Sequence, residues 1–139
     1  MDLATMMFVS YRAMDERVVG AMRAAGFDVT PAQARLAQRI ADGGSRLTDL
    51  ARQAQVTKQT ASLLVVALEE KGLVERVPDP ADGRARLIRF TPQGRVAAEQ
   101  ALQVVAAVER EWEEHLGAQL AECLREALIR LREVTDPSG

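Results

Sequence analysis

The sequence predicts a mainly α-helical protein with one small β-hairpin, an α+β arrangement. Three observations support this prediction. Ala and Leu are abundant and aromatic residues are few. Apolar residues recur at steps of three and four along most of the chain. One turn rich in Pro, Asp and Gly separates two short strand-like runs. A length of 139 residues fits a single domain.

The first predicted helix spans residues 2–25. Its apolar residues are spaced so that they share one face of a helix. Gly26 is the expected stop, because glycine adopts the left-handed conformation that ends many helices. The stripe consists of Leu3, Met7, Tyr11, Met14, Val18, Ala21 and Ala25.

The second predicted helix has a strong start signal. The segment Thr30–Gln33 contains a capping box with proline in the first turn. Leu36 and Ile40 supply the buried face of this helix. We expect it to continue to Gly43-Gly44, which would stop it.

Two helices joined by a tight turn follow. A short strand is predicted at Arg46-Leu47, and the first helix of the pair runs from Thr48 to about Gln53. The turn has Gln55 where a glycine is frequent, which adds slight strain. The second helix is capped by Thr57 and runs to Lys71, and Gly72 ends it.

This pair has the features of a helix-turn-helix. Two closely crossing helices need a small residue in the first one, and Ala51 occupies that place. Val56 is the apolar residue after the turn. The predicted inward face of the second helix is Ala61, Leu64, Val65 and Leu68. The residues that then face outward are Lys58, Gln59, Ser62, Leu63 and Val66.

The exposed residues near the start of the second helix suit DNA. Gln59 can read adenine through paired hydrogen bonds, and Leu63 can touch a thymine methyl group. The hydroxyls of Thr60 and Ser62 can serve several bases. Lys58, with the free amides at the helix start, suits phosphate. The alternative is an ordinary helix with solvated polar side chains, and the hairpin downstream makes DNA the preferred interpretation.

The predicted hairpin joins runs at Leu73–Pro78 and Arg86–Thr91. Its turn is expected at Asp79–Gly83, because proline cannot donate to a strand ladder and glycine takes conformations closed to other residues. Directly after a helix-turn-helix, such a hairpin is typical of a DNA-binding wing.

The arginines of this hairpin are its candidate functional residues. Arg84 or Arg86 can enter a narrow minor groove, where the negative potential is concentrated. In the alternative interpretation these arginines pair locally with Asp79 and Asp82. Both can hold, because a contact between Asp82 and Arg84 would stiffen the tip.

The last third of the chain is predicted to be helical. Thr91-Pro92 repeats the start signal, and a helix runs past Trp112 until Gly117 interrupts it. Its stripe is Leu102, Val105, Val108, Trp112 and Leu116, and that of the final helix is Leu120, Leu124, Leu128 and Leu131. The terminal stripes are too long for a small domain to bury, so they predict a homodimer. Packing of the stripes within one chain is the alternative.

Charge and composition exclude several classes of protein. The net charge is −2, yet residues 44–90 hold eight Lys or Arg against six Asp or Glu, while the remainder holds ten against fourteen. One Cys and one His cannot form a disulfide framework or a usual zinc site. We expect no cofactor, no metal and no catalytic residues, since no nucleophile–base arrangement or phosphate-binding glycine loop is present. We also expect no signal peptide and no membrane span, and a cytoplasmic setting.

The chain resembles the MarR family of winged helix-turn-helix transcriptional regulators. The resemblance covers nearly the whole sequence. It is most specific in Leu68–Val74, in the hairpin motif Asp79-Pro-x-Asp-x-Arg84, and in the exit Phe90-Thr-Pro-x-Gly94. By position, the Asp and Arg of the family's wing fall on Asp82 and Arg84.

The resemblance implies a division of the 139 residues into two parts. Residues 30–91 would form the winged-helix part that binds DNA, and residues 1–25 and 92–135 the helices that interdigitate in a homodimer. The dimer would bind a palindromic operator in double-stranded DNA and would repress nearby genes. A small, often aromatic ligand would release it. We place that pocket near Tyr11, Arg12, Leu36 and Trp112.

The chain departs from the family at two places. Recognition helices of the family often carry Arg at the positions of Leu63 and Ala67, so this helix is unusually apolar. Peroxide-sensing members have a Cys in the first helix, whereas Cys123 lies in the last one and is expected to be buried and structural. The apolar outward face motivates an alternative function, a winged-helix dimer that binds another protein and binds DNA weakly or not at all.

Overall fold

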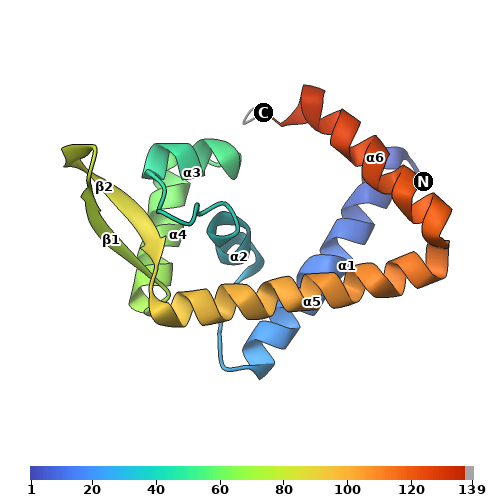
Figure 1. Cartoon of the computed structure of the whole chain (residues 1–139), viewed down its shortest axis with the longest axis horizontal. Helices are drawn as coiled ribbons and strands as arrows, with labels where there is room; N and C mark the ends of the chain where they lie inside the picture. The colour runs from blue at the N-terminus through green and yellow to red at the C-terminus, as the bar shows by residue number, and fades with distance from the viewer. Residues whose placement is uncertain (137–139) are drawn as a thin grey trace. The chain divides into compact units, whose positions relative to one another are not determined.

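The computed structural model describes residues 1–136, in which six helices and a two-stranded antiparallel sheet are present (Figure 1). In chain order they are α1 (Leu3–Ala24), α2 (Pro31–Ala37), α3 (Leu47–Gln53), α4 (Lys58–Glu70), β1 (Val74–Asp79), β2 (Asp82–Phe90), α5 (Pro92–Leu116) and α6 (Ala118–Thr135). The predicted fold class, mainly α with a β-hairpin, is confirmed. The described residues form two compact units, one of residues 29–99 and one of residues 1–28 with those from 100 on.

The unit of residues 29–99 has its core around α4, which packs against α2, α3 and β1. Burial of a leucine side chain contributes about 1.5–3 kcal/mol, so a few such residues account for much of the stability of this unit. Its most completely buried apolar residues are Leu36, Leu50, Ala61, Val65, Leu68 and Ile88. Three of these residues, Ala61, Val65 and Leu68, form the inward face of α4 that the helical periodicity predicted. Leu64, predicted for the same face, is only half-buried.

Most of the predicted start and stop signals of the helices act as expected. The Thr30 hydroxyl accepts from the Gln33 amide, and the Gln33 side chain accepts from the Thr30 amide, so the capping box is complete. Gly72 follows the last residue of α4 with a φ of 73°, a left-handed value that glycine adopts without strain. Gln55 has a φ of 56° in the turn before α4, where a non-glycine residue is strained, as expected.

Two predictions about the segment between α2 and α3 were wrong. The second helix ends at Ala37 and not at Gly43, because the amides of Arg39 and Ile40 bond three residues back and tighten the chain. This winding still buries Ile40. The predicted strand at 46–47 is also absent, since α3 begins at Leu47 and only Ser45 pairs with β2.

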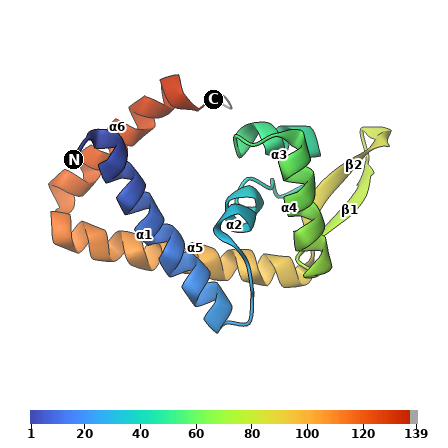
Figure 2. The same ribbon diagram turned by 180° about the vertical axis from the view of Figure 1, so that it is seen from behind.

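The hairpin has a longer second strand and a tighter turn than predicted. Asp79 pairs with Asp82, so Pro80 and Ala81 alone form the turn, and Asp82 and Gly83 belong to β2. The turn lies at the end of the hairpin away from the start of α5 (Figure 2). At the other end α5 begins against the hairpin, and a Cβ on Gly94 would lie 1.8 Å from the Leu73 carbonyl oxygen. Only glycine fits there.

The second unit contains α1, most of α5 and α6. Val18, Val19, Met22 and Val108 are buried in it, and the Arg17 guanidinium donates to both carboxylate oxygens of Glu111 at 2.7 and 2.9 Å. Gly117 separates α5 from α6 as predicted. Cys123 is exposed, so the expectation of a buried cysteine was wrong, because no residue of α6 is buried among the described residues. None of the helices described is long and apolar enough to cross a membrane.

Candidate nucleic-acid interface

The first half of α4 presents its predicted outward residues to solvent. Lys58, Gln59 and Thr60 are exposed in its first turn, and Leu63 follows with 67% of its surface exposed. Ser62 is half-buried, so it is less exposed than predicted. The outward face therefore offers an ammonium, an amide and a hydroxyl group close to the helix start, and then an apolar side chain.

The cap of α4 also orients one of these groups. The Thr57 hydroxyl accepts from the Thr60 amide at 3.0 Å and donates to the Thr60 hydroxyl at 2.9 Å. Because the oxygen of Thr60 accepts this bond, its own hydrogen is free to be donated to a ligand. The helix start thus combines donors from the backbone and from a side chain, which suits an anion.

The arginines of the hairpin divide into paired and unpaired ones. Arg76 donates to Glu69 at 3.0 Å and Arg89 to Glu75 at 2.8 Å. Arg84 and Arg86 are exposed near the turn, and their guanidinium groups have no ion-pair partner among residues 1–136. Positive charge that can be used for binding is therefore concentrated near the tip of the hairpin.

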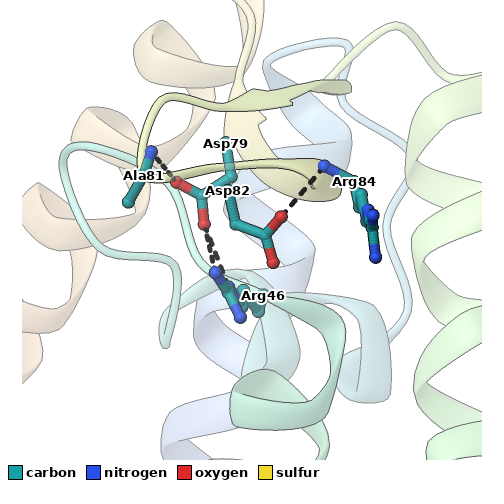
Figure 3. Close-up of polar contacts among 5 residues, drawn as sticks. All are labelled: Arg46, Asp79, Ala81, Asp82 and Arg84. Atoms are coloured by element: carbon teal, nitrogen blue, oxygen red, sulfur yellow. Dashed lines mark hydrogen bonds and ion pairs between the residues drawn. The ribbon is translucent and has the colours of Figure 1, made fainter.

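The base of the tip is held by an ion pair that the sequence did not predict. Nε and Nη2 of Arg46 donate to one carboxylate oxygen of Asp79 at 3.0 and 2.7 Å, and the Ala81 amide donates to the other at 2.9 Å (Figure 3). The Ala81 amide and the Arg46 guanidinium hold the pKa of the Asp79 carboxyl below its ordinary value. Asp79 thereby ties the hairpin to the residue that precedes α3.

Asp82 acts within the tip itself. Its carboxylate accepts from the backbone amide of Arg84 at 3.0 Å, a bond at the start of β2 that restricts the backbone beside the turn (Figure 3). We expected a contact between Asp82 and Arg84, and it is made by the backbone amide of Arg84 and not by its guanidinium group. The guanidinium group of Arg84 remains available. Asp79, which we considered as a partner for the wing arginines, is engaged by Arg46.

The four residues predicted for a ligand pocket belong to different units. Leu36 is completely buried in the core of residues 29–99. Tyr11, Arg12 and Trp112 belong to the other unit, where Tyr11 is exposed, Arg12 pairs with Glu16 and Trp112 is half-buried. The pocket stays a prediction.

The surface formed by α4 and the hairpin matches what duplex DNA requires. A helix with an exposed first half fits a major groove, and unpaired arginines on an adjacent hairpin suit phosphates or a minor groove. No charged side chain occurs from Gln59 to Leu68, so the cations stand at the edges of the surface.

Comparison with known proteins gives matches to one family. A model of the MarR family matches residues 27–85, the segment that contains α2 to the hairpin turn. The transcriptional regulator HosA of Escherichia coli O111:H- is 29% identical over 105 residues, which cover 75% of this chain and 78% of that protein.

Solved structures show the same fold. MarR of E. coli, in a mutant complexed with operator DNA, is 24% identical with a TM-score of 0.75, and the match covers 93% of this chain and 92% of that one. CouR of Rhodococcus jostii RHA1, bound to p-coumaroyl-CoA, is 23% identical with a TM-score of 0.77, and the match covers 98% and 93%. The winged helix-turn-helix expected from the sequence is confirmed. Over residues 27–85 the chain is thus similar to the MarR family of transcriptional regulators.

Proposed function

We propose that the chain acts as a homodimer that binds a palindromic operator and represses transcription until a small ligand releases it. The observation that carries this proposal is the pair of unpaired guanidinium groups, Arg84 and Arg86, on the hairpin that follows the exposed face of α4. Arginine is suited to phosphate and to narrow minor grooves because its guanidinium group is planar and permanently charged. Operator DNA is the ligand in the solved complex of MarR. Binding to a chromosomal operator places the protein in the cytoplasm.

The support for a dimer is the apolar surface of α1 and α6. Leu3, Phe8 and Val9 of α1 are more than half exposed, and a row of α6 residues is open as well. Isolated chains rarely leave such continuous apolar patches uncovered. The exposed large apolar residues of α6 are Leu120, Leu124, Leu128, Ile129, Leu131 and Val134. A second copy would cover these patches, and it would present two recognition helices to sites about 34 Å apart.

The experiment that tests DNA binding compares two arginines of the same strand. Duplexes that bind the full chain are selected from a random library, and affinity is measured by fluorescence anisotropy. Arg84→Ala should weaken binding at least fivefold. Arg89→Ala is the matched control, since Arg89 is engaged by Glu75 and should change affinity little. Equal effects of the two substitutions would contradict the assignment of Arg84 to DNA.

We propose a small aromatic compound as the ligand, with Tyr11, Arg12 and Trp112 as its candidate contacts. CouR bound to p-coumaroyl-CoA supports this class of ligand. The chain has one tryptophan, so its fluorescence reports on Trp112 alone. Titration with p-coumarate should quench that fluorescence and release bound DNA over the same range of concentration. Quenching without release of DNA would remove the regulatory role from this site.

A second candidate function is a protein-interaction module, and the exposed Leu63 and Val66 favour it. In that case Leu63→Lys would abolish capture of a partner protein from cell extract, and no duplex would be selected. Selection of a palindromic duplex by the unmodified chain would instead support the DNA-binding regulator. The free cations at the edges of the same surface make DNA the preferred partner.

A further inference from the structure

Between Gln59 and Leu68 the outward face of α4 lacks charge and contains an exposed leucine. Gln59 and Leu63 are four residues apart and so lie on the same side of the helix. Leu63 is 67% exposed and Val66 is 41% exposed, although both are apolar. The unpaired cations Arg84 and Arg86 belong to the same unit. Apart from the hydroxyl groups of Thr60 and Ser62, the surface that these cations bring to DNA is therefore one amide followed by hydrocarbon.

The chemistry of base edges limits what such a face can read. Guanine is most often read by Arg or Lys, which donate to its N7 and O6, and neither residue type occurs between Gln59 and Leu68. The amide of Gln59 matches N6 and N7 of adenine. A leucine side chain against cytosine or guanine would bury their polar atoms without partners, which is unfavourable. Beside thymine the same side chain buries a methyl group.

We propose that each half-site is specified by an adenine at Gln59 and by a thymine methyl group at Leu63, which makes Leu63 a specificity-determining residue. The proposal rests on the proposed DNA-binding function. Four residues of helix advance about 6 Å, and base pairs are stacked about 3.4 Å apart. The adenine and the thymine should therefore lie within about two base pairs of each other in the major groove. Lys58, Arg84 and Arg86 contribute affinity without this sequence information.

Uracil tests the methyl contact directly, because it lacks the 5-methyl group of thymine and keeps every hydrogen-bonding group. The duplex is the one selected with the unmodified full chain, and each thymine is replaced singly. One thymine in each half-site should show about a fourfold loss of affinity on replacement, the effect of exposing one buried methyl group. The other thymines should show no change.

Two variants locate the contact on the protein. Leu63→Ala should bind thymine and uracil duplexes equally at the sensitive position. Val96→Ala is the matched control, because Val96 is half exposed on α5 and lies outside the α4 face. It should keep the fourfold preference for thymine. A Leu63→Ala protein that also keeps this preference would overturn the assignment.

The unmodified chain alone is decisive if Leu63→Ala folds poorly. Salt-dependent binding with equal affinity for thymine and uracil at every position would overturn the inference and leave the DNA-binding function intact. In that case the exposed Leu63 and Val66 would instead be contacts for a protein partner. Failure to select any duplex would overturn both proposals, so the two failures are distinguishable.

Discussion

Asp79 joins two segments that are far apart in the sequence. One oxygen of its carboxylate holds the Arg46 guanidinium and the other holds the Ala81 amide of the turn. The side chain is almost fully buried while that of Arg46 remains half exposed. Removal of the charge would leave these donors with a weaker acceptor and would loosen the hairpin from the rest of its unit.

Acidification should reveal this contribution. The pKa of Asp79 is lowered in the folded state, from an unfolded value of about 3.9. The stabilisation is therefore complete above that unfolded value and is lost as the pH falls through the folded pKa. Urea unfolding at pH 7 should show Asp79→Asn to be less stable than the unmodified chain, and the difference should shrink at pH 3. A difference that is the same at both pH values would contradict the ion-pair account.

The residues of the candidate interface were predictable to different degrees. The exposure of Lys58, Gln59 and Leu63 follows from the helical period. The apolar residues Ala61, Val65 and Leu68 fix the buried side of α4, and the three exposed residues lie away from it. The partners of the arginines were not predictable. The sequence places Glu75 and Asp79 close to several arginines, and only the strand register and the fold decide that Glu75 takes Arg89 and Asp79 takes Arg46.

At the scale of elements, local signals decided where helices begin, whereas the end of α2 and the turn of the hairpin departed from the signals in the sequence. Thr30, Thr57 and Thr91 cap α2, α4 and α5 with their hydroxyl groups, all from local sequence. The end of α2 at Ala37 follows instead from a tighter winding, in which the amides of Arg39 and Ile40 bond three residues back, and no glycine marks it. The tight turn of the hairpin follows from strand pairing, which short turn motifs do not determine.

Two glycines in helices should respond oppositely to the same substitution. Gly94→Ala would push a Cβ into the Leu73 carbonyl, and overpacking of this kind costs about 1–3 kcal/mol. Gly20→Ala meets nothing within 4 Å in α1 and should stabilise the helix by up to about 1 kcal/mol. Thermal unfolding followed by circular dichroism measures both. A Gly94→Ala protein as stable as the unmodified chain would show that α5 does not depend on this close approach.

At the scale of the whole molecule, the proposed dimer depends on the terminal helices. No residue of α6 is buried, so in the proposed dimer the helix would take most of its packing from the partner. The N-terminal half of α1 is exposed in the same way. The pattern of apolar residues predicted these stripes. It did not predict how much of each a single chain would cover.

Substitution of a leucine on α6 should separate the chains. Leu124→Glu places a charge in the patch that a partner would bury, and light scattering should then report the mass of one chain in place of two. Leu63→Glu is the matched control, because it makes the same change at an exposed leucine on α4. That variant should remain a dimer and lose DNA binding. A monomeric unmodified chain would contradict the dimer.

The salt dependence of operator binding tests the central claim most directly. A dimer that brings Lys58, Arg84 and Arg86 of both chains to phosphates makes about six such contacts, so the slope of log affinity against log salt should be about −5. Arg84→Ala removes two of these cations and should reduce the magnitude of the slope by about two. A slope near zero, or one that Arg84→Ala leaves unchanged, would contradict the account.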